Sequence, residues 1–219
     1  MHNVTVAFAV LLVMLLSYFF GCFNGSFMVS HFIIRDDVRK HGSGNAGLTN
    51  FYRTYGAKYA LLVIACDMGK TVAACLLGSF FFRCLGWDGT LGTLLAGLGC
   101  ELGHIFPVFY GFRGGKGILS GGTLVLLLNW RVAAVAWALF LLLWLTTRYV
   151  SLASITATCS APITVYFVYA HNWLYTGLCL AVAALVVWCH RENIQRLLHG
   201  TEKKFKWHVN PMEGKDPPQ

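Results

Sequence analysis

A glycine-rich polar segment between residues 41 and 53 is the first place where this sequence offers side chains for chemistry. It reads His41-Gly-Ser-Gly-Asn-Ala-Gly-Leu-Thr-Asn50 and is followed by Phe, Tyr and Arg53. Its glycines permit a tight backbone that exposes N–H groups, and the Arg53 guanidinium can bind phosphate through two hydrogen bonds. The segment therefore indicates either a phosphate-binding nest or a flexible loop between two spans. The candidate phosphate and substrate contacts are Ser43, Arg53, Gly42, Gly44, Asn45, Thr49 and Asn50.

A second glycine-rich segment, residues 103–117, encloses a lysine between glycines. It reads Gly-His-Ile-Phe-Pro-Val-Phe-Tyr-Gly-Phe-Arg-Gly-Gly-Lys-Gly. The P-loop of nucleotide-hydrolysing enzymes would need glycine at Tyr110 and Ser or Thr at Gly117, so the pattern argues against that class of site. It favours an anion-binding loop at the start of a helix beginning at Ile118, and the alternative is a basic anchor at a membrane surface. The candidate residues are Lys116, His104, Gly114, Gly115 and Gly117.

A third polar segment, residues 190–202, follows the last apolar run and reads His-Arg-Glu-Asn-Ile-Gln-Arg-Leu-Leu-His-Gly-Thr-Glu. As a helix it would place His190 and Asn193 on one face, and Gly200 would end it. By itself the segment is more typical of an amphipathic helix lying on anionic lipid, because basic helices are common at the ends of membrane spans.

Ionisable residues inside apolar runs are candidates for function. Asp67 and Lys70 are three residues apart and can meet on one helix face, where we expect a structural ion pair. Glu101 and His104 have the same spacing. A di-iron site would need that motif twice, with two further glutamates, so we predict no metal.

The composition indicates a membrane protein. Of 219 residues, 57% are hydrophobic and 12% are charged, whereas soluble domains carry about 25% charged residues. The mean hydropathy is +0.60. These values exclude a disordered chain and argue against a soluble enzyme. We expect bends at Gly21 and Gly25, and close helix packing at Gly99 and Gly103. The predicted fold is an all-α integral membrane protein with about seven transmembrane helices, over residues 4–34, 60–82, 89–109, 118–129, 132–147, 149–170 and 173–190.

The positive charges are unevenly divided between the two sides of this map. All but three of the 17 lysines and arginines lie in residues 35–59, 110–117 and 191–219 or at Arg148. The positive-inside rule places these segments in the cytoplasm, with the N-terminus outside and the C-terminus cytoplasmic. Membrane orientation explains the net charge of +8 better than a nucleic-acid partner does. We expect one membrane domain over residues 1–210 and a polar tail over residues 211–219.

Together the three polar segments resemble the bacterial acyl-phosphate:glycerol-3-phosphate acyltransferase family, PlsY. The resemblance rests on Ser43-Gly-Asn-Ala-Gly-Leu-Thr-Asn50 with Arg53, on Gly103-His-Ile-Phe-Pro-Val-Phe109 with Gly114-Gly-Lys-Gly117, and on residues 190–202. The segments have the family's order and spacing and cover nearly the whole chain. The sequence departs from the family at Ile118-Leu-Ser120, often Val-Ala-Thr, and at Thr71, where glycine is usual. Neither departure changes a group to which we assign chemistry.

The resemblance implies a seven-helix fold that transfers a fatty acyl group from acyl phosphate to glycerol 3-phosphate. The products would be 1-acyl-glycerol 3-phosphate and inorganic phosphate, at the first step of bacterial phospholipid synthesis. We expect a multi-pass monomer in the cytoplasmic membrane, surrounded by lipid, with its active site on the cytoplasmic face and no cofactor. His190 or a substrate phosphate oxygen would serve as the base. The residues to which we assign catalysis are Ser43, Arg53, Lys116, His190 and Asn193.

Two other classes of membrane protein compete with this interpretation. A transporter or channel would explain glycine-broken segments and the intramembrane Asp67, Lys70 and Glu101. However, the chain has no evident internal repeat, and its motifs map to one membrane face rather than the midplane. A non-catalytic scaffold gives no reason for three segments that suit phosphate.

Overall fold

A computed structural model describes residues 2–206. All of the regular secondary structure in this range is helical, without a strand. This confirms the all-α class. The predicted polar tail, residues 211–219, lies outside the described residues. The α-helices are α1 (His2–Cys22), α2 (Gly25–Met28), α3 (Leu48–Tyr55), α4 (Ala60–Cys84), α5 (Gly89–Ile105), α6 (Ile118–Leu128), α7 (Trp130–Thr147), α8 (Val150–Val168), α9 (Trp173–Cys189) and α10 (Arg191–Leu198).

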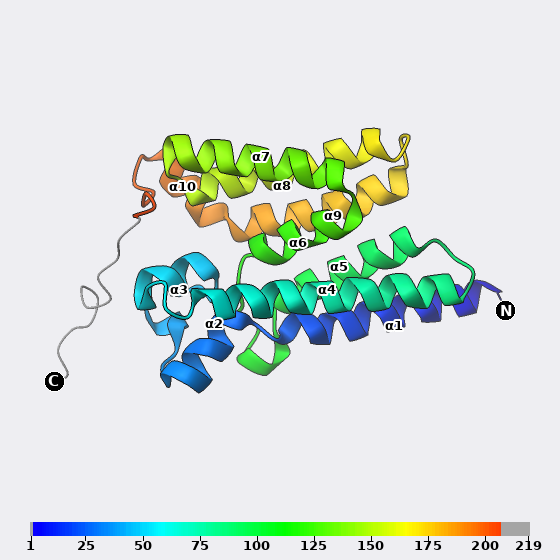
Figure 1. Cartoon of the computed structure of the whole chain (residues 1–219), viewed down its shortest axis with the longest axis horizontal. Helices are drawn as coiled ribbons and strands as arrows, with labels where there is room; N and C mark the ends of the chain where they lie inside the picture. The colour runs from blue at the N-terminus through cyan, green and yellow to red at the C-terminus, as the bar shows by residue number, and fades with distance from the viewer. Residues whose placement is uncertain (1, 207–219) are drawn as a thin grey trace.

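The long helices form two layers, with the short helix α6 between them (Figure 1). One layer consists of α1, α4 and α5, and the other of α7, α8 and α9, while α6 contacts helices of both layers. Buried apolar side chains at Leu94 of α5, Val125 of α6 and Val132 of α7 belong to a single cluster. The two layers are therefore joined by one continuous core rather than by loops alone.

Five segments of the described chain are helical, long and apolar enough to cross a bilayer: Val4–Ile34, Ala60–Cys84, Gly89–Tyr110, Trp130–Thr147 and Val150–Val168. A sixth results if α9 and α10, which are bent by 59° at their junction, count as one span. Helix α6 has 11 residues, or about 16 Å at 1.5 Å per residue, which is shorter than the roughly 30 Å of a hydrocarbon core. Each predicted span thus corresponds to helical structure. Helix α6 is the one whose length falls furthest short of the thickness of the hydrocarbon core.

Helices α1 and α5 approach each other closely because α5 presents glycines to the α1 backbone. A Cβ atom added to Gly103 would collide with the carbonyl oxygen of Tyr18, and one added to Gly99 would stand 2.5 Å from that of Met14. No larger residue fits there without separating the helices. The expected close packing at these two glycines is confirmed.

The first predicted span is interrupted between the two glycines at which we expected bends. Helix α1 ends at Cys22, and Asn24 has an extended backbone and caps α2, its side-chain oxygen accepting a hydrogen bond from the N–H of Phe27 at 2.9 Å. Helix α2 then continues into a π-helix, Val29–Ile34. This break brings the chain to the first glycine-rich segment at one end of the bundle.

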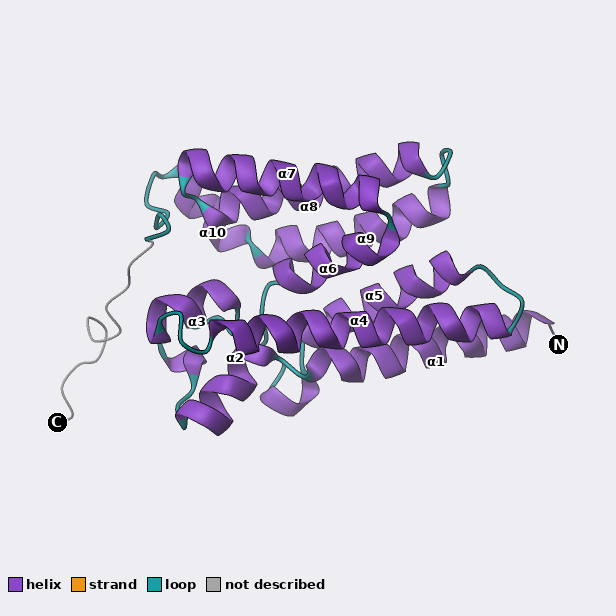
Figure 2. Ribbon diagram, viewed as in Figure 1, coloured by secondary structure: helices purple, strands orange, loops and turns teal. Residues whose placement is uncertain are grey.

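The three polar segments lie at that same end, where loops connect α3 and α10 to the long helices (Figure 2). Helix α6 begins at Ile118, as the sequence predicts, after Gly117 in a left-handed conformation with φ of 80°. Helix α10 ends at Leu198, and Gly200, with φ of 67°, stops it as expected. The bundle therefore gathers at one end the segments that the sequence separates by up to about 150 residues.

Candidate active site

The first glycine-rich segment is folded around the side chain of Asn50, in the first turn of α3. The Asn50 Oδ1 atom accepts a hydrogen bond from the Ser43 N–H at 2.9 Å, and a Cβ atom on Gly42 would collide with that oxygen. The Ser43 side chain is left exposed. Asn50, which we had expected to contact substrate, thus uses its polar atoms to build the loop. Its Nδ2 atom lies 3.0–3.2 Å from the carbonyl oxygens of Val38, His41 and Asn45.

The first and second glycine-rich segments are joined directly through their backbones. The Ala46 N–H donates to the Gly114 carbonyl at 3.3 Å, and the Asn45 Nδ2 donates to the same oxygen at 3.4 Å. The second segment in turn folds back over the end of α5, where the Gly115 N–H donates to the His104 carbonyl at 3.1 Å. The two segments therefore act as one structural unit that carries Ser43 and Lys116.

His190 lies at the bend between α9 and α10 and is buried. Its Nδ1 atom lies 2.8 Å from the Val186 carbonyl oxygen, and since that oxygen only accepts, Nδ1 carries the hydrogen. In the neutral ring, Nε2 then holds the free lone pair. Asn193 follows on the same side, with its Oδ1 atom hydrogen-bonded to the Nζ of Lys116. The predicted shared face of His190 and Asn193 is present, and it meets the second segment.

Glu202 organises the third segment, and sequence reasoning assigned it no role. Its carboxylate accepts hydrogen bonds from Asn193 Nδ2 at 2.7 Å, Ser151 Oγ at 2.7 Å and Arg196 Nε at 2.8 Å. Burial by itself raises the pKa of Glu202, but these hydrogen bonds and the Arg196 charge outweigh it and hold the pKa below its ordinary value. Glu202 therefore stays ionised and fixes which way the Asn193 amide faces Lys116. An acidic residue two positions after the Gly200 helix stop was the available signal.

A cavity of about 840 Å³ brings the three segments together. Its polar lining includes Arg196 and Glu202, and its apolar lining comes mainly from α6, α7, α8 and α9, including Trp137 and Val182. Among the predicted residues, Gly44, Gly114 and Gly115 do not line it. Those that do are Gly42, Ser43, Asn45, Thr49, Asn50, Arg53, His104, Lys116, Gly117, His190 and Asn193.

Lys116 and Arg53, from different segments, are among the cations that line this cavity. Burial lowers the pKa of Lys116, the Arg196 charge lowers it further, and Glu202 opposes both. Burial also lowers the pKa of Arg53, with Glu202 acting in the opposite sense. Arg53 donates to the Lys203 carbonyl oxygen at 3.1 Å, and Phe205 stacks on Tyr52 with ring centroids 5.4 Å apart. The chain after α10 therefore borders the cavity beside Arg53.

Comparison with known proteins identifies the class of enzyme. The family model described as glycerol-3-phosphate acyltransferase matches residues 11–200, and this chain belongs to that family. A glycerol-3-phosphate acyltransferase of Finegoldia magna is 38% identical over 189 residues, covering 86% of this chain and 92% of the relative. That of Syntrophomonas wolfei is 38% identical over 192 residues, covering 88% and 95%.

Solved structures agree with this assignment. The crystal structure of PlsY (YgiH), described as an integral membrane glycerol 3-phosphate acyltransferase in its glycerol 3-phosphate form, superposes with a TM-score of 0.80 at 36% identity. It covers 90% of this chain and 96% of the other. The lysophosphatidic acid form gives a TM-score of 0.77 at 34% identity, with coverage of 90% and 95%. The chain is thus an integral membrane acyltransferase whose family serves phospholipid synthesis.

Proposed function

We propose that this enzyme transfers a fatty acyl group from acyl phosphate to glycerol 3-phosphate, giving 1-acyl-glycerol 3-phosphate and inorganic phosphate. The observation that carries the proposal is the division of one cavity into a cationic end and an apolar remainder. Both proposed substrates carry a phosphate, and the donor also carries a hydrocarbon chain. The two solved relatives, in forms with glycerol 3-phosphate and with lysophosphatidic acid, support the acceptor and the product.

The phosphate groups would be held at the cationic end by Lys116, Arg53 and Ser43. Lys116 has one described hydrogen-bond partner, the neutral amide of Asn193, so two of its three hydrogens remain for phosphate oxygens. Arg53 uses one Nη2 hydrogen on the Lys203 carbonyl, which leaves the other side of its fork available. Such donors would also stabilise charge on the leaving phosphate.

The chemical step would be direct attack of the glycerol hydroxyl on the acyl carbonyl carbon. The new C–O ester bond forms, the C–O bond to phosphate breaks, and the hydroxyl proton ends on the released phosphate. An acyl phosphate is already activated, so positioning supplies much of the rate. The His190 Nε2 lone pair can orient the hydroxyl and relay its proton, or a phosphate oxygen can take the proton directly.

The apolar part of the cavity would accommodate the acyl chain. It is lined by side chains of α6–α9 such as Trp137, Phe140, Ala161 and Val182, and a volume of about 840 Å³ lies within the range of ligand pockets, roughly 300–1,000 Å³. A donor whose hydrocarbon chain starts beside Lys116 would then extend between the two helical layers.

In the membrane, we propose seven spans with the N-terminus outside and the active site on the cytoplasmic face. In this arrangement α6 is the short fourth span and α9 the seventh. The asymmetry of lysine and arginine supports this orientation, as does the position of α3 and α10 at one end of the bundle. The orientation is tested by fusing to the C-terminus a reporter that is active only in the cytoplasm. If this fusion is inactive, while a fusion to a reporter that is active only in the periplasm is active, the topology is the reverse of the proposed one.

The reaction is tested by adding palmitoyl phosphate and glycerol 3-phosphate to the detergent-purified monomer, without nucleotide or metal. We expect phosphate and lysophosphatidic acid to form in equal amounts. A Lys116→Ala variant that elutes and melts like wild type should form neither at a comparable rate.

Two results would contradict the proposal in different ways. If product forms from acyl-CoA or acyl-carrier protein and none forms from acyl phosphate, the proposed donor is wrong and the proposed acceptor still holds. Full activity in folded Lys116→Ala and Arg53→Ala variants would instead place the reaction elsewhere in the molecule.

A further inference from the structure

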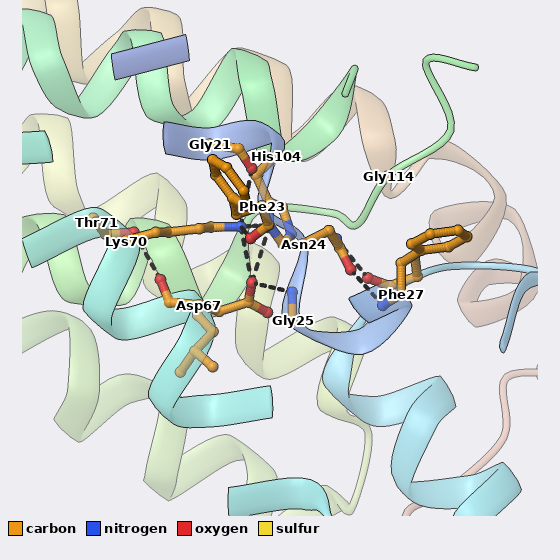
Figure 3. Close-up of polar contacts among 12 residues, drawn as sticks. Gly21, Phe23, Asn24, Gly25, Phe27, Asp67, Lys70, Thr71, His104 and Gly114 are labelled. Atoms are coloured by element: carbon orange, nitrogen blue, oxygen red, sulfur yellow. Dashed lines mark hydrogen bonds and ion pairs between the residues drawn. The ribbon is translucent and has the colours of Figure 1, made fainter. Parts of the chain in front are cut away.

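A buried polar network lies beside the candidate active site and at the break between α1 and α2 (Figure 3). Its centre is Lys70, whose Nζ atom is 3.1 Å from the Gly21 carbonyl, 3.0 Å from the Phe23 carbonyl and 2.8 Å from Asp67 Oδ1. Asp67 also accepts a hydrogen bond from the Gly25 N–H at 3.0 Å. The expected ion pair is confirmed, and it holds together the two ends of the interrupted helix.

His104 extends this network toward the second glycine-rich segment. Its Nδ1 atom lies 2.7 Å from Lys70 Nζ and 3.6 Å from Asp67 Oδ1, so the ion pair fixes the position of this side of the ring. The Nε2 side faces the second segment, since a Cβ atom added to Gly115 would collide with His104 Nε2.

The collision at Gly115 is steric and not a matter of backbone conformation. Gly115 is not among the glycines with positive φ, so an alanine could adopt its backbone angles. The next nearest atom to the added Cβ, apart from the imidazole, is the Ala46 carbonyl oxygen at 3.1 Å, a distance that a shift of a few tenths of an ångström relieves. The imidazole is therefore the main obstacle, and it fixes how closely the residue before Lys116 can approach α5.

We propose that His104, oriented by Lys70 and Asp67, is a positioning residue that seats Gly115 and thereby aims Lys116 into the cavity. Lys116 would contact the phosphate, while His104 acts through the backbone of Gly115, the residue before Lys116. This inference rests on the proposed phosphate site. It also differs from our sequence-based expectation, in which His104 itself contacts the substrate.

The test is a double-mutant cycle between His104→Ala and Gly115→Ala. The measured quantity is the affinity for glycerol 3-phosphate by calorimetry in detergent, with no acyl donor present. Loss of a hydrogen bond to a charged group costs about 10- to 100-fold in binding, so we expect Gly115→Ala to weaken binding by about 100-fold and His104→Ala by about tenfold. In the double variant the added methyl group occupies the space of the missing ring, and the alanine at position 115 should cost less than about threefold.

Gly114→Ala is the matched control. Its Cβ atom would collide with the backbone carbonyl oxygen of His104, which remains when the side chain is removed. We expect its cost to be the same with and without His104→Ala. If Gly115→Ala folds only when His104→Ala is also present, the measured quantity becomes the yield of folded protein. Rescue of that yield by His104→Ala then supports the proposal in the same way.

Several outcomes would overturn the proposal. If His104 binds phosphate itself, the two substitutions will add and the double variant will be the weakest. If Gly115→Ala binds glycerol 3-phosphate as tightly as wild type does, the His104 ring does not limit the position of the second segment. A failure of the proposed phosphate site is recognised separately, because wild type would then not bind glycerol 3-phosphate, whereas a different acyl donor would leave this binding unchanged.

The contribution of the ion pair is tested by Asp67→Asn combined with Lys70→Met, so that neither charge is left buried alone. We expect the KM for glycerol 3-phosphate to rise several-fold while the KM for the acyl donor stays within about twofold. Equal changes in both constants, or none, would remove Lys70 and Asp67 from the positioning role.

Discussion

Lys70 and Lys116 are two lysines within the same helical bundle, and their surroundings differ in one respect that separates scaffold from active site. Lys70 is buried against two carbonyls, a carboxylate and an imidazole, which exceeds the three hydrogens it can donate. Lys116 has one described side-chain partner, a neutral amide, and lines an 840 Å³ cavity. A lysine whose hydrogens are all bonded to protein acceptors holds helices together. A lysine at a cavity with hydrogens left unbonded is available to an anion.

The largest effect that tests this comparison is on stability. Lys70→Ala leaves Asp67 buried without its partner, and breaking such a pair costs about 3–5 kcal/mol. We expect the free energy of unfolding in mixed detergent to fall by about this amount, with most of the protein lost from membranes. The Asp67→Asn, Lys70→Met double variant should be clearly more stable than Lys70→Ala. A Lys70→Ala protein as stable as wild type would show that the network is not the scaffold.

Lys116→Ala should show the opposite behaviour. Removing one preorganised donor from a transition state costs about 10²–10³-fold, so we expect kcat/KM for glycerol 3-phosphate to fall by that factor. The melting temperature in detergent should change by less than about 2 °C, because Lys116 makes few contacts that folding depends on. A large loss of stability with unchanged kcat/KM in the folded fraction would make the two lysines alike.

Glu202→Gln sharpens the comparison by disturbing the surroundings of Lys116 without touching the lysine. The glutamine keeps the shape but loses the charge that pairs with Arg196 and orients Asn193. We expect a loss of about tenfold in kcat/KM, near the 1.5 kcal/mol of a hydrogen bond to a charged group. Ser151→Ala, which removes a third and uncharged donor, is the control and should cost about threefold or less. Equal effects would argue against a role for the charge.

The smallest effect concerns pH. Burial lowers the pKa of Lys116, so the ammonium loses its proton at a lower pH than an exposed lysine does. Affinity for the anionic acceptor should be complete below this pKa and should decline as the pH rises through it. We expect the alkaline decline of 1/KM for glycerol 3-phosphate to occur below the usual lysine range, and to move upward in Lys116→Arg. The pH profile of 1/KM for both proteins, from neutral to about pH 10.5, checks this; coincident profiles would assign the decline to another group.

Much of the site was predictable because its residue types are conspicuous in an apolar chain. Glycines beside Lys116, a hydroxyl at Ser43 and a guanidinium at Arg53 have little reason to interrupt membrane helices unless they bind something polar. The helix starting at Ile118, the stop at Gly200 and the ion pair of Asp67 with Lys70 follow from local spacing, since helical periodicity fixes which neighbours can meet. The family followed from the order of the three segments.

Other features depend on which segments meet in space, and no local pattern encodes that. Asn50 and Thr49 are adjacent polar residues that both line the cavity, yet the fold uses the Asn50 amide to hold loop backbone. His104 lies in the second segment, but the break after Cys22 places Lys70 against its ring. Glu202 accepts a hydrogen bond from Ser151, 51 residues earlier in the chain, which no local pattern predicts. The sequence by itself determined the chemistry available and the membrane class, while the tertiary structure decided which polar groups are satisfied by the protein and which are left for substrate.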